Sequence, residues 1–205
     1  MKQNIFPVLV LLITAALLLP QAHAEDPKTR GKAGDLLTPL AMGNTWVYAS
    51  EEENTVTTER IEGVVLFEGR PWHLLRSYER QADQPAEADE SIGIELWLAQ
   101  IDGHECDAFV EPIEPDDEFA ELKLGPISKY FRYPATLGDS YKPNSDDTTI
   151  IMTITAINEK VKTKAGEFDC VVYTETSTED EGYRNTNWVA PGVGIVKTQS
   201  IEEGE

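Results

Sequence analysis

From residue 45 onward, apolar and polar residues alternate in runs separated by Gly, Pro and Asp. The runs are rich in Thr, Val, Ile, Tyr and Trp, the residues that favour strands. They predict strands over residues 45–50, 55–67, 71–80, 91–100, 108–112, 129–133, 148–162, 167–176, 183–189 and 194–201. Helical periodicity is weak, and its best example covers residues 116–122. The sequence therefore predicts an all-β fold with little helix.

Several of these runs are longer than the usual strand of about five or six residues. Long strands suit a strongly bent antiparallel sheet or an open half-barrel, in which one strand curves across much of the fold. Turns at Gly69 and Gly166 predict two hairpins. After the second turn, both alternating sets of side chains are largely apolar, and Asp169 is the exception. We therefore expect both faces of that sheet to be covered.

The first 24 residues are typical of a secretory signal peptide. Lys2 supplies a positive charge, residues 8–19 form an apolar run that is short for a bilayer span, and Ala22-His23-Ala24 is a small-x-small cleavage site. An uncleaved anchor is the alternative. We expect cleavage after Ala24 and a soluble, exported bacterial protein, either periplasmic or secreted.

Composition divides the rest of the chain into two parts. Residues 25–38 mix Pro, Gly, Lys and Asp without periodicity, and they predict a flexible N-terminal segment. Residues 39–205 predict a single β-rich domain, which is long enough to bury a core. No second apolar run of membrane length follows the signal.

The chain is strongly acidic, with 17 Lys and Arg against 37 Asp and Glu and a net charge of −20. Nucleic acid is excluded as an expected partner, because phosphate backbones are bound by clustered basic residues and the basic residues here are scattered. The acidic residues fall in short groups, which are typical of solvated loops. The alternative is a calcium site at residues 111–118, although the spacing of a calcium-binding loop is missing there.

Four motifs resemble those of one family. They are GNTWVY at residues 43–48, YPATLGDSY at 133–141, AGEFDC at 165–170 and WVAPGVGIVK at 188–197. The chain resembles the TapB-like group of bacterial secreted proteins, a domain of unknown function, over nearly its whole mature length. It departs from the pattern at Tyr141, where Trp is frequent, and at Lys164, where Pro is usual. The resemblance implies a curved antiparallel sheet with an apolar concave face, similar to the half-barrel of the periplasmic lipoprotein carriers.

The sequence predicts no catalytic, cofactor-binding or metal-ligating set. Only His73 and His104 remain after the signal peptide. The stretch His104-Glu105-Cys106 brings together a histidine, a carboxylate and a thiol, but zinc requires three or four converging ligands. A turn at Asp102 followed by a strand is the preferred interpretation. Carboxylate pairs are too numerous to single out a hydrolase site.

Two pairs of residues are candidates for special roles. Cys106 and Cys170 are the only cysteines, and an oxidising compartment predicts a disulfide between them. The alternative is that both are unbridged. Trp72 and Trp97 occupy alternating strand positions, where aromatic residues usually pack the core and where they can also face a ligand.

These features predict a non-enzymatic exported protein that binds an apolar small molecule, a lipid or an envelope protein on a concave sheet face. The first alternative is an assembly scaffold that pairs with another chain through a sheet edge. The second is a hydrolase of unrecognised type.

We predict that the exported protein begins at Glu25, because the cleavage site lies between Ala24 and Glu25. Intact-mass measurement of the protein recovered from the periplasm or medium of an expressing bacterium checks this. A mass that retains residues 1–24 contradicts cleavage.

Overall fold

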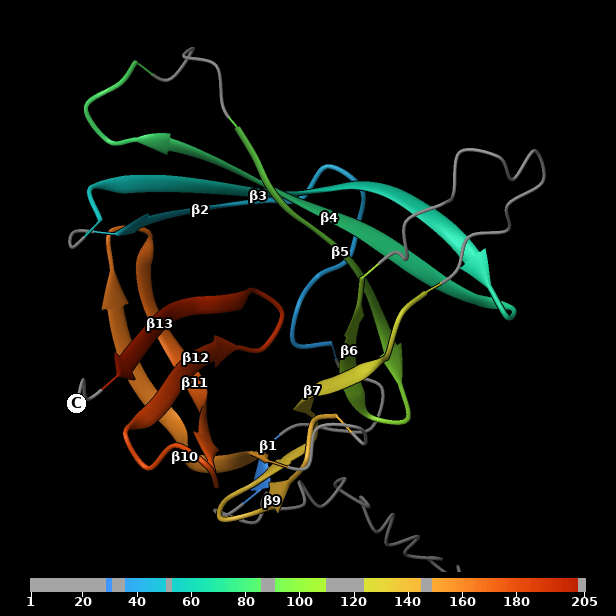
Figure 1. The fold of residues 1–205 in the computed structure, drawn as a ribbon, viewed down its shortest axis with the longest axis vertical. Coiled ribbons are helices and arrows are strands. Elements are labelled where there is room, and N and C mark those ends of the chain that lie inside the picture. The colour runs from blue at the N-terminus through green and yellow to red at the C-terminus, as the bar shows by residue number, and fades with distance from the viewer. Residues whose placement is uncertain are drawn as a thin grey trace, which may run out of the picture.

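The computed structural model describes residues 29–30, 36–50, 53–85, 91–109, 124–144 and 149–202, and these form strands and no helix (Figure 1). The strands are β1 (Thr29–Arg30), β2 (Thr45–Ser50), β3 (Thr55–Phe67), β4 (Arg70–Gln81), β5 (Ser91–Ile101), β6 (His104–Ala108), β7 (Ser128–Arg132), β8 (Ala135–Thr136), β9 (Ser140–Tyr141), β10 (Ile150–Thr163), β11 (Gly166–Ser177), β12 (Tyr183–Ala190) and β13 (Gly194–Glu202). The prediction of an all-β fold is confirmed. The candidate helix at residues 116–122 and the candidate calcium site at 111–118 lie outside the described residues.

The turn at Asp102 and Gly103 and the strand predicted to follow it are confirmed, because β6 begins at His104 and ends at Ala108. The separate strand predicted at residues 108–112 overlaps β6 only at Ala108, and residues 110–112 lie outside the described residues. The sequence of β6, HECDA, has few strand-favouring residues. Glu105 and Asp107 lie on one face of the strand, and the small buried residues Cys106 and Ala108 lie on the other. The strands β1, β8 and β9, of two residues each, were too short to give a pattern.

The strands form two antiparallel sheets in a curled half-barrel. A six-stranded sheet has the order β2-β3-β4-β5-β6-β7, and a five-stranded sheet has the order β13-β12-β11-β10-β9. β1 pairs with β8 in a small third sheet. In Figure 1 the six-stranded sheet arches over the top and right, the five-stranded sheet stands at the left, and the β3–β4 hairpin projects away from it.

The six-stranded sheet has two buried faces. Its inner face carries Ile61, Leu75 and Leu98, which pack with Leu40 and are joined by the partly buried Trp46. Its outer face carries a second cluster, which consists of Trp72, Trp97, Ala99, Cys106 and Ala108. Adjacent residues of a strand point to opposite faces, so the same strands supply both clusters.

The two sheets share one core. Phe131 of β7 packs against Met152, Ile154, Val171 and Tyr173 of the five-stranded sheet. The rings of Phe131 and Tyr173 lie 4.8 Å apart, and the Tyr173 hydroxyl donates a hydrogen bond of 2.7 Å to the carbonyl of Arg132. Aromatic packing and this bond therefore join β7 to β11.

A segment that precedes the first long strand also joins the sheets. We call residues 36–44 the strap; its N-terminal part runs between the two sheets (Figure 1). Leu37 is 2% exposed and belongs to the shared core. The amide of Gly192, in the turn between β12 and β13, donates to the Leu37 carbonyl at 2.8 Å. The sequence predicts a flexible segment over residues 25–38. The prediction is wrong for its last residues, because Leu37 and Thr38 are buried between the sheets.

The close approach of Thr38 and Trp46 to the backbone explains why residue 194 is a glycine. Gly194 has φ +100, and a Cβ atom there would lie 3.3 Å from Thr38 Oγ1 and 3.4 Å from the indole nitrogen of Trp46. That indole nitrogen donates a hydrogen bond of 2.6 Å to the Val193 carbonyl. Only glycine combines this backbone conformation with this space.

Among the described residues, no helix has the length and apolar character needed to cross a membrane.

Replacing Phe131 by Ala should lower the free energy of unfolding by about 3–5 kcal/mol, because the change leaves a cavity in the shared core. Phe109, which is 64% exposed, is the matched control, and Phe109→Ala should change stability by about 0.5 kcal/mol or less. Denaturant unfolding of both variants tests the difference. Equal losses would contradict a core that is centred on Phe131.

Candidate functional site

An open-sided cavity of about 350 Å³ lies between the strap and the inner face of the six-stranded sheet. Leu36, Leu40 and Ala41 of the strap form one wall, and Pro71, His73 and Gln100 form the other. Small-molecule sites commonly measure about 300–1,000 Å³ and are lined mainly by apolar groups with a few polar ones. The volume and the lining of this cavity fall within that range, while the cavity is broadly open to solvent.

Strand alternation explains why these side chains reach the cavity. Pro71 and His73 are two residues apart on β4, so both point to the inner face, whereas Trp72 between them points outward. His73 pairs with Leu98 of β5, which places Gln100 on the same inner face two residues further along that strand. The cavity wall is thus one face of two neighbouring strands.

The inner face stays apolar beyond the cavity. Val64 pairs with His73, and Leu66 pairs with Pro71. A register shift between Ile61 and Gly63 lets these residues share the inner face with Ile61. Val64 is 49% exposed and Leu66 is 78% exposed. The β3–β4 hairpin therefore adds an apolar rim to the cavity.

His73 is the ionisable residue of the lining. Its Nδ1 atom is buried and has no hydrogen-bond partner in the described structure. Burial lowers the pKa of the imidazole below its ordinary value. The ring is therefore neutral at pH 7, and it presents one donor and one acceptor nitrogen in an apolar setting.

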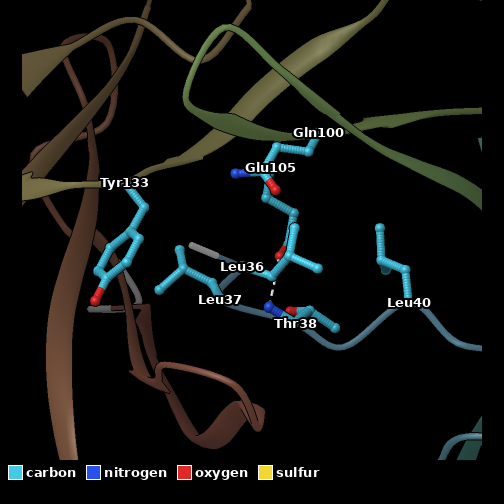
Figure 2. A pocket seen from close by; sticks show the side chains of 7 residues that line it. All are labelled: Leu36, Leu37, Thr38, Leu40, Gln100, Glu105 and Tyr133. Carbon is cyan, nitrogen blue, oxygen red and sulfur yellow. Dashed lines mark hydrogen bonds between the residues drawn. The ribbon is translucent and has the colours of Figure 1, made fainter. Parts of the chain in front are cut away.

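A second, much smaller cavity adjoins the first. Its volume of about 10 Å³ is close to the space that one water needs. The seven side chains drawn in Figure 2 line it: Leu36, Leu37, Thr38, Leu40, Gln100, Glu105 and Tyr133. Leu36, Leu40 and Gln100 also line the large cavity. The two spaces therefore share walls in the strap and on β5.

Glu105 ties the strap to β6. The Thr38 amide donates a hydrogen bond of 3.1 Å to Glu105 Oε2, drawn as the dashed line in Figure 2. Burial raises the pKa of this carboxyl to about 7, against the opposing effect of the bonds from Thr38, and the nearby Asp107 raises it further. Near neutral pH the group is therefore divided between its protonated and ionised forms.

Other buried carboxyl groups serve as links between strands. Glu175 of β11 is 7% exposed and accepts hydrogen bonds from Tyr130 at 2.9 Å and from Tyr183 at 2.6 Å. Burial, followed by the charge of Glu175, raises the pKa of Tyr130. Since Tyr130 lies on β7, this pair joins the two sheets away from the cavity.

The aromatic candidates from the sequence do not face the cavity. Trp72 and Trp97 are 1% and 7% exposed and pack together in the outer-face cluster. They lie next to His73 and Leu98, which point inward, so alternation directs both indoles outward. In this structure they fill a core rather than a ligand site.

The structure does not bring the two cysteines together. Cys106 lies in the outer-face cluster of the six-stranded sheet, whereas Cys170 packs with Val161 and Ala190 of the five-stranded sheet. The two thiols are buried and are not joined in a disulfide. Burial raises the pKa of Cys106 to about 11, which makes it a poor nucleophile at neutral pH.

His104 belongs to a surface cluster and not to the cavity. Its Nε2 atom accepts a hydrogen bond of 3.2 Å from Arg132, whose guanidinium lies 4.6 Å from the centre of the Tyr141 ring. Burial and then the positive charge of Arg132 lower the pKa of His104. Within the described ranges, no three His, Cys, Asp or Glu side chains form a group that could hold a metal ion.

Sequence reasoning missed the residues that line the cavity. The pair Leu36-Leu37 is an apolar signal inside a polar segment, and it could have indicated that the strap is packed. The sequence distinguishes His73 only as one of the two histidines that follow the signal peptide. Its position opposite the strap depends on the path of residues 36–44 between the sheets, which no local pattern encodes.

The sequence matches no protein-family model and no curated protein. Two solved structures are similar to the chain. One, a predicted lipoprotein from Parabacteroides distasonis, has 13% identity and a TM-score of 0.43, over 82% of this chain and 92% of its own. The other, a predicted exported protein with a YmcC-like fold from Bacteroides fragilis, has 14% identity and a TM-score of 0.45, over 81% and 91%. Membership of the TapB-like group stays a prediction.

Stability should fall as the pH rises through the range between 4.5, the reference pKa of Glu105, and its folded value of about 7. A carboxyl whose pKa is raised by folding stabilises the protein fully below the reference pKa, and this stabilisation is lost as the pH passes the folded pKa. The Glu105→Gln variant should lack this loss, which is on the order of 2 kcal/mol. Urea unfolding across that range measures it.

The exposed Glu181 provides the matched control. Glu181→Gln should keep the pH dependence of the original protein, because this side chain lies in the turn between β11 and β12. If Glu105→Gln and the original protein lose stability in parallel as the pH rises, Glu105 is not the group responsible.

Proposed function

We propose that this protein binds an apolar or amphipathic small molecule in the cavity between the strap and the inner face of β4 and β5. The observation that supports this proposal most strongly is the cavity of about 350 Å³, whose described lining residues are apolar except for His73 and Gln100. The exposed Val64 and Leu66 continue its apolar wall. The proposed role is binding without catalysis. The cavity and its rim form an apolar opening on the surface of an acidic protein.

The energetics favour a chain-like ligand. Each buried methylene group contributes about 0.8 kcal/mol. Enclosing about eight of them gives roughly 6 kcal/mol, from which the cost of association must be subtracted. The cavity therefore supports moderate affinity for a single hydrocarbon chain, and the apolar rim adds contact for a longer one.

The strap favours a preformed site. Its backbone is held by the hydrogen bond from Gly192 to Leu37 on one side and by the bond from Thr38 to Glu105 on the other. Asn44 also donates a bond of 2.7 Å to the Pro39 carbonyl within the strap. A wall held in this way needs little ordering when a ligand enters, which preserves affinity.

We place this activity outside the cytoplasm, in the periplasm or beyond it. The support is the signal-like pattern of residues 1–24. The TapB-like motifs also suit such a location. A half-barrel that carries an apolar molecule through an aqueous compartment is consistent with the inner-face cavity, and this comparison is one of architecture only.

A second candidate function is pairing with an envelope protein through a sheet edge. Among the described strands, β13 pairs only with β12, and residues 197–201 of β13 are exposed. Such an edge can accept an added strand. The cavity gives ligand binding the stronger support, because edge pairing does not use it.

Ala41→Trp should weaken ligand binding about tenfold or more, since the indole would fill the cavity that Ala41 lines. Ala49→Trp is the matched control: Ala49 is exposed on β2, and it alternates with Trp46 and Tyr48 so that it shares the face of Val47. Binding of the uncharged fluorophore N-phenyl-1-naphthylamine to the purified protein is the measurement.

Two outcomes would contradict the proposal. The first is that the fluorophore and single-chain amphiphiles all fail to bind the original protein. The second is that Ala41→Trp and Ala49→Trp bind as the original protein does, since the site would then lie elsewhere. Native mass spectrometry of the protein, isolated without detergent, adds a direct test for a co-purified ligand.

A further inference from the structure

We infer that the ligand is an uncharged single-chain amphiphile, whose hydroxyl-bearing or ester-bearing head binds at His73 and Gln100 and whose tail lies along the strap. This inference rests on the proposed function. It specifies the chemistry of the ligand from the lining of the cavity and from the charges around it.

The two polar side chains of the lining can meet one head group. His73 and Gln100 lie on the neighbouring strands β4 and β5, on the same face, and His73 pairs directly with Leu98. Gln100 is therefore the diagonal neighbour of His73, and diagonal neighbours in an antiparallel pair are about 7–8 Å apart. A head with two or three polar atoms spans that distance.

A head that both donates and accepts hydrogen bonds suits these two side chains. A neutral imidazole has one donor and one acceptor nitrogen, and a glutamine amide has both kinds of group. The Nδ1 atom of His73 is buried and has no hydrogen-bond partner in the described structure, so a head group reaches this atom only when the ring turns toward the cavity. A head with hydroxyl and ester or amide groups can engage both side chains without bringing a charge.

An anionic head is disfavoured. None of the six lining residues carries a basic side chain that is charged at pH 7, because burial keeps His73 neutral. The protein as a whole has a net charge of −20. A carboxylate or phosphate would therefore lose its hydration without gaining a counter-charge, which is costly.

A cationic head gains little inside the cavity. The long-range field of an acidic protein attracts cations, but none of the described residues that line the large cavity carries a carboxylate. Glu105 lines only the small adjoining space, where it is engaged with Thr38. A trimethylammonium head would lose its hydration in the cavity without gaining a partner there. The negative field of the protein therefore attracts such a cation to the surface but does not stabilise it inside the cavity.

The cavity volume offers apolar contact to one chain. About 350 Å³ is near the lower end of the range for small-molecule sites. Leu36, Leu40 and Pro71 provide apolar contact along it, and Leu66, the strand partner of Pro71, extends this wall outward. One chain can follow this path, whereas a two-chain lipid would leave much of its second chain in water.

The first test compares amphiphiles that share a lauroyl or dodecyl chain. Displacement of N-phenyl-1-naphthylamine, below the micelle concentration of each compound, ranks monolauroylglycerol, laurate and dodecyltrimethylammonium at neutral pH. We expect monolauroylglycerol to bind about tenfold tighter than either charged compound. If laurate or the cation binds as tightly or more tightly, the inference is wrong while the proposed function stands.

If none of the three compounds and no fluorophore binds, the proposed function fails together with the inference. A preference for the uncharged head supports both. The ranking uses the original protein, so it does not depend on the folding of any variant.

The second test locates the head group. Gln100→Leu should weaken monolauroylglycerol about tenfold and leave N-phenyl-1-naphthylamine nearly unchanged, because only the amphiphile needs the amide. Gln81→Leu, at an exposed position at the end of β4, is the matched control and should bind both compounds as the original protein does. Equal binding of monolauroylglycerol to both variants would remove Gln100 from the head-group site.

Discussion

The short backbone segment from Gly192 to Ile195 holds the two sheets and the strap together. Its amide at Gly192 binds Leu37, its carbonyl at Val193 receives the Trp46 indole, and the Ile195 carbonyl accepts a bond of 3.2 Å from the Tyr48 hydroxyl. Trp46 and Tyr48 are each separated from their acceptors by 147 positions. Both the closure of the half-barrel and the path of the strap depend on these contacts, and without the strap the cavity would have no second wall.

The two faces of β4 have different roles because successive side chains of a strand point to opposite sides. Trp72 enters the outer cluster, where close packing contributes to stability, while His73 and Pro71 remain available to the cavity. The packing of the outer cluster stabilises this part of the sheet. The sheet therefore does not depend on close packing of side chains against its inner face at the cavity. A cavity can therefore persist beside a close-packed core without the hairpin losing its support.

Local patterns predicted most of the strands, because alternation and turn residues are encoded over a few positions. They did not show that Glu105 of β6 faces the strap, because its place there depends on a hydrogen bond from Thr38, 67 positions away. The cavity was also beyond their reach. Trp72 and Trp97 are candidates in the sequence because aromatic side chains often contact ligands. The cavity is lined instead by residues such as Leu36 and Pro71, which have no distinctive chemistry and come together only in the tertiary fold.

The strong acidity of the chain is compatible with an apolar opening. An exposed apolar rim at Val64 and Leu66 would by itself favour association between copies. A net charge of −20 makes the approach of two copies unfavourable at moderate ionic strength. Small uncharged molecules do not experience this repulsion. The net charge therefore opposes contact between the rim and other acidic proteins, and it places no such barrier before an uncharged molecule.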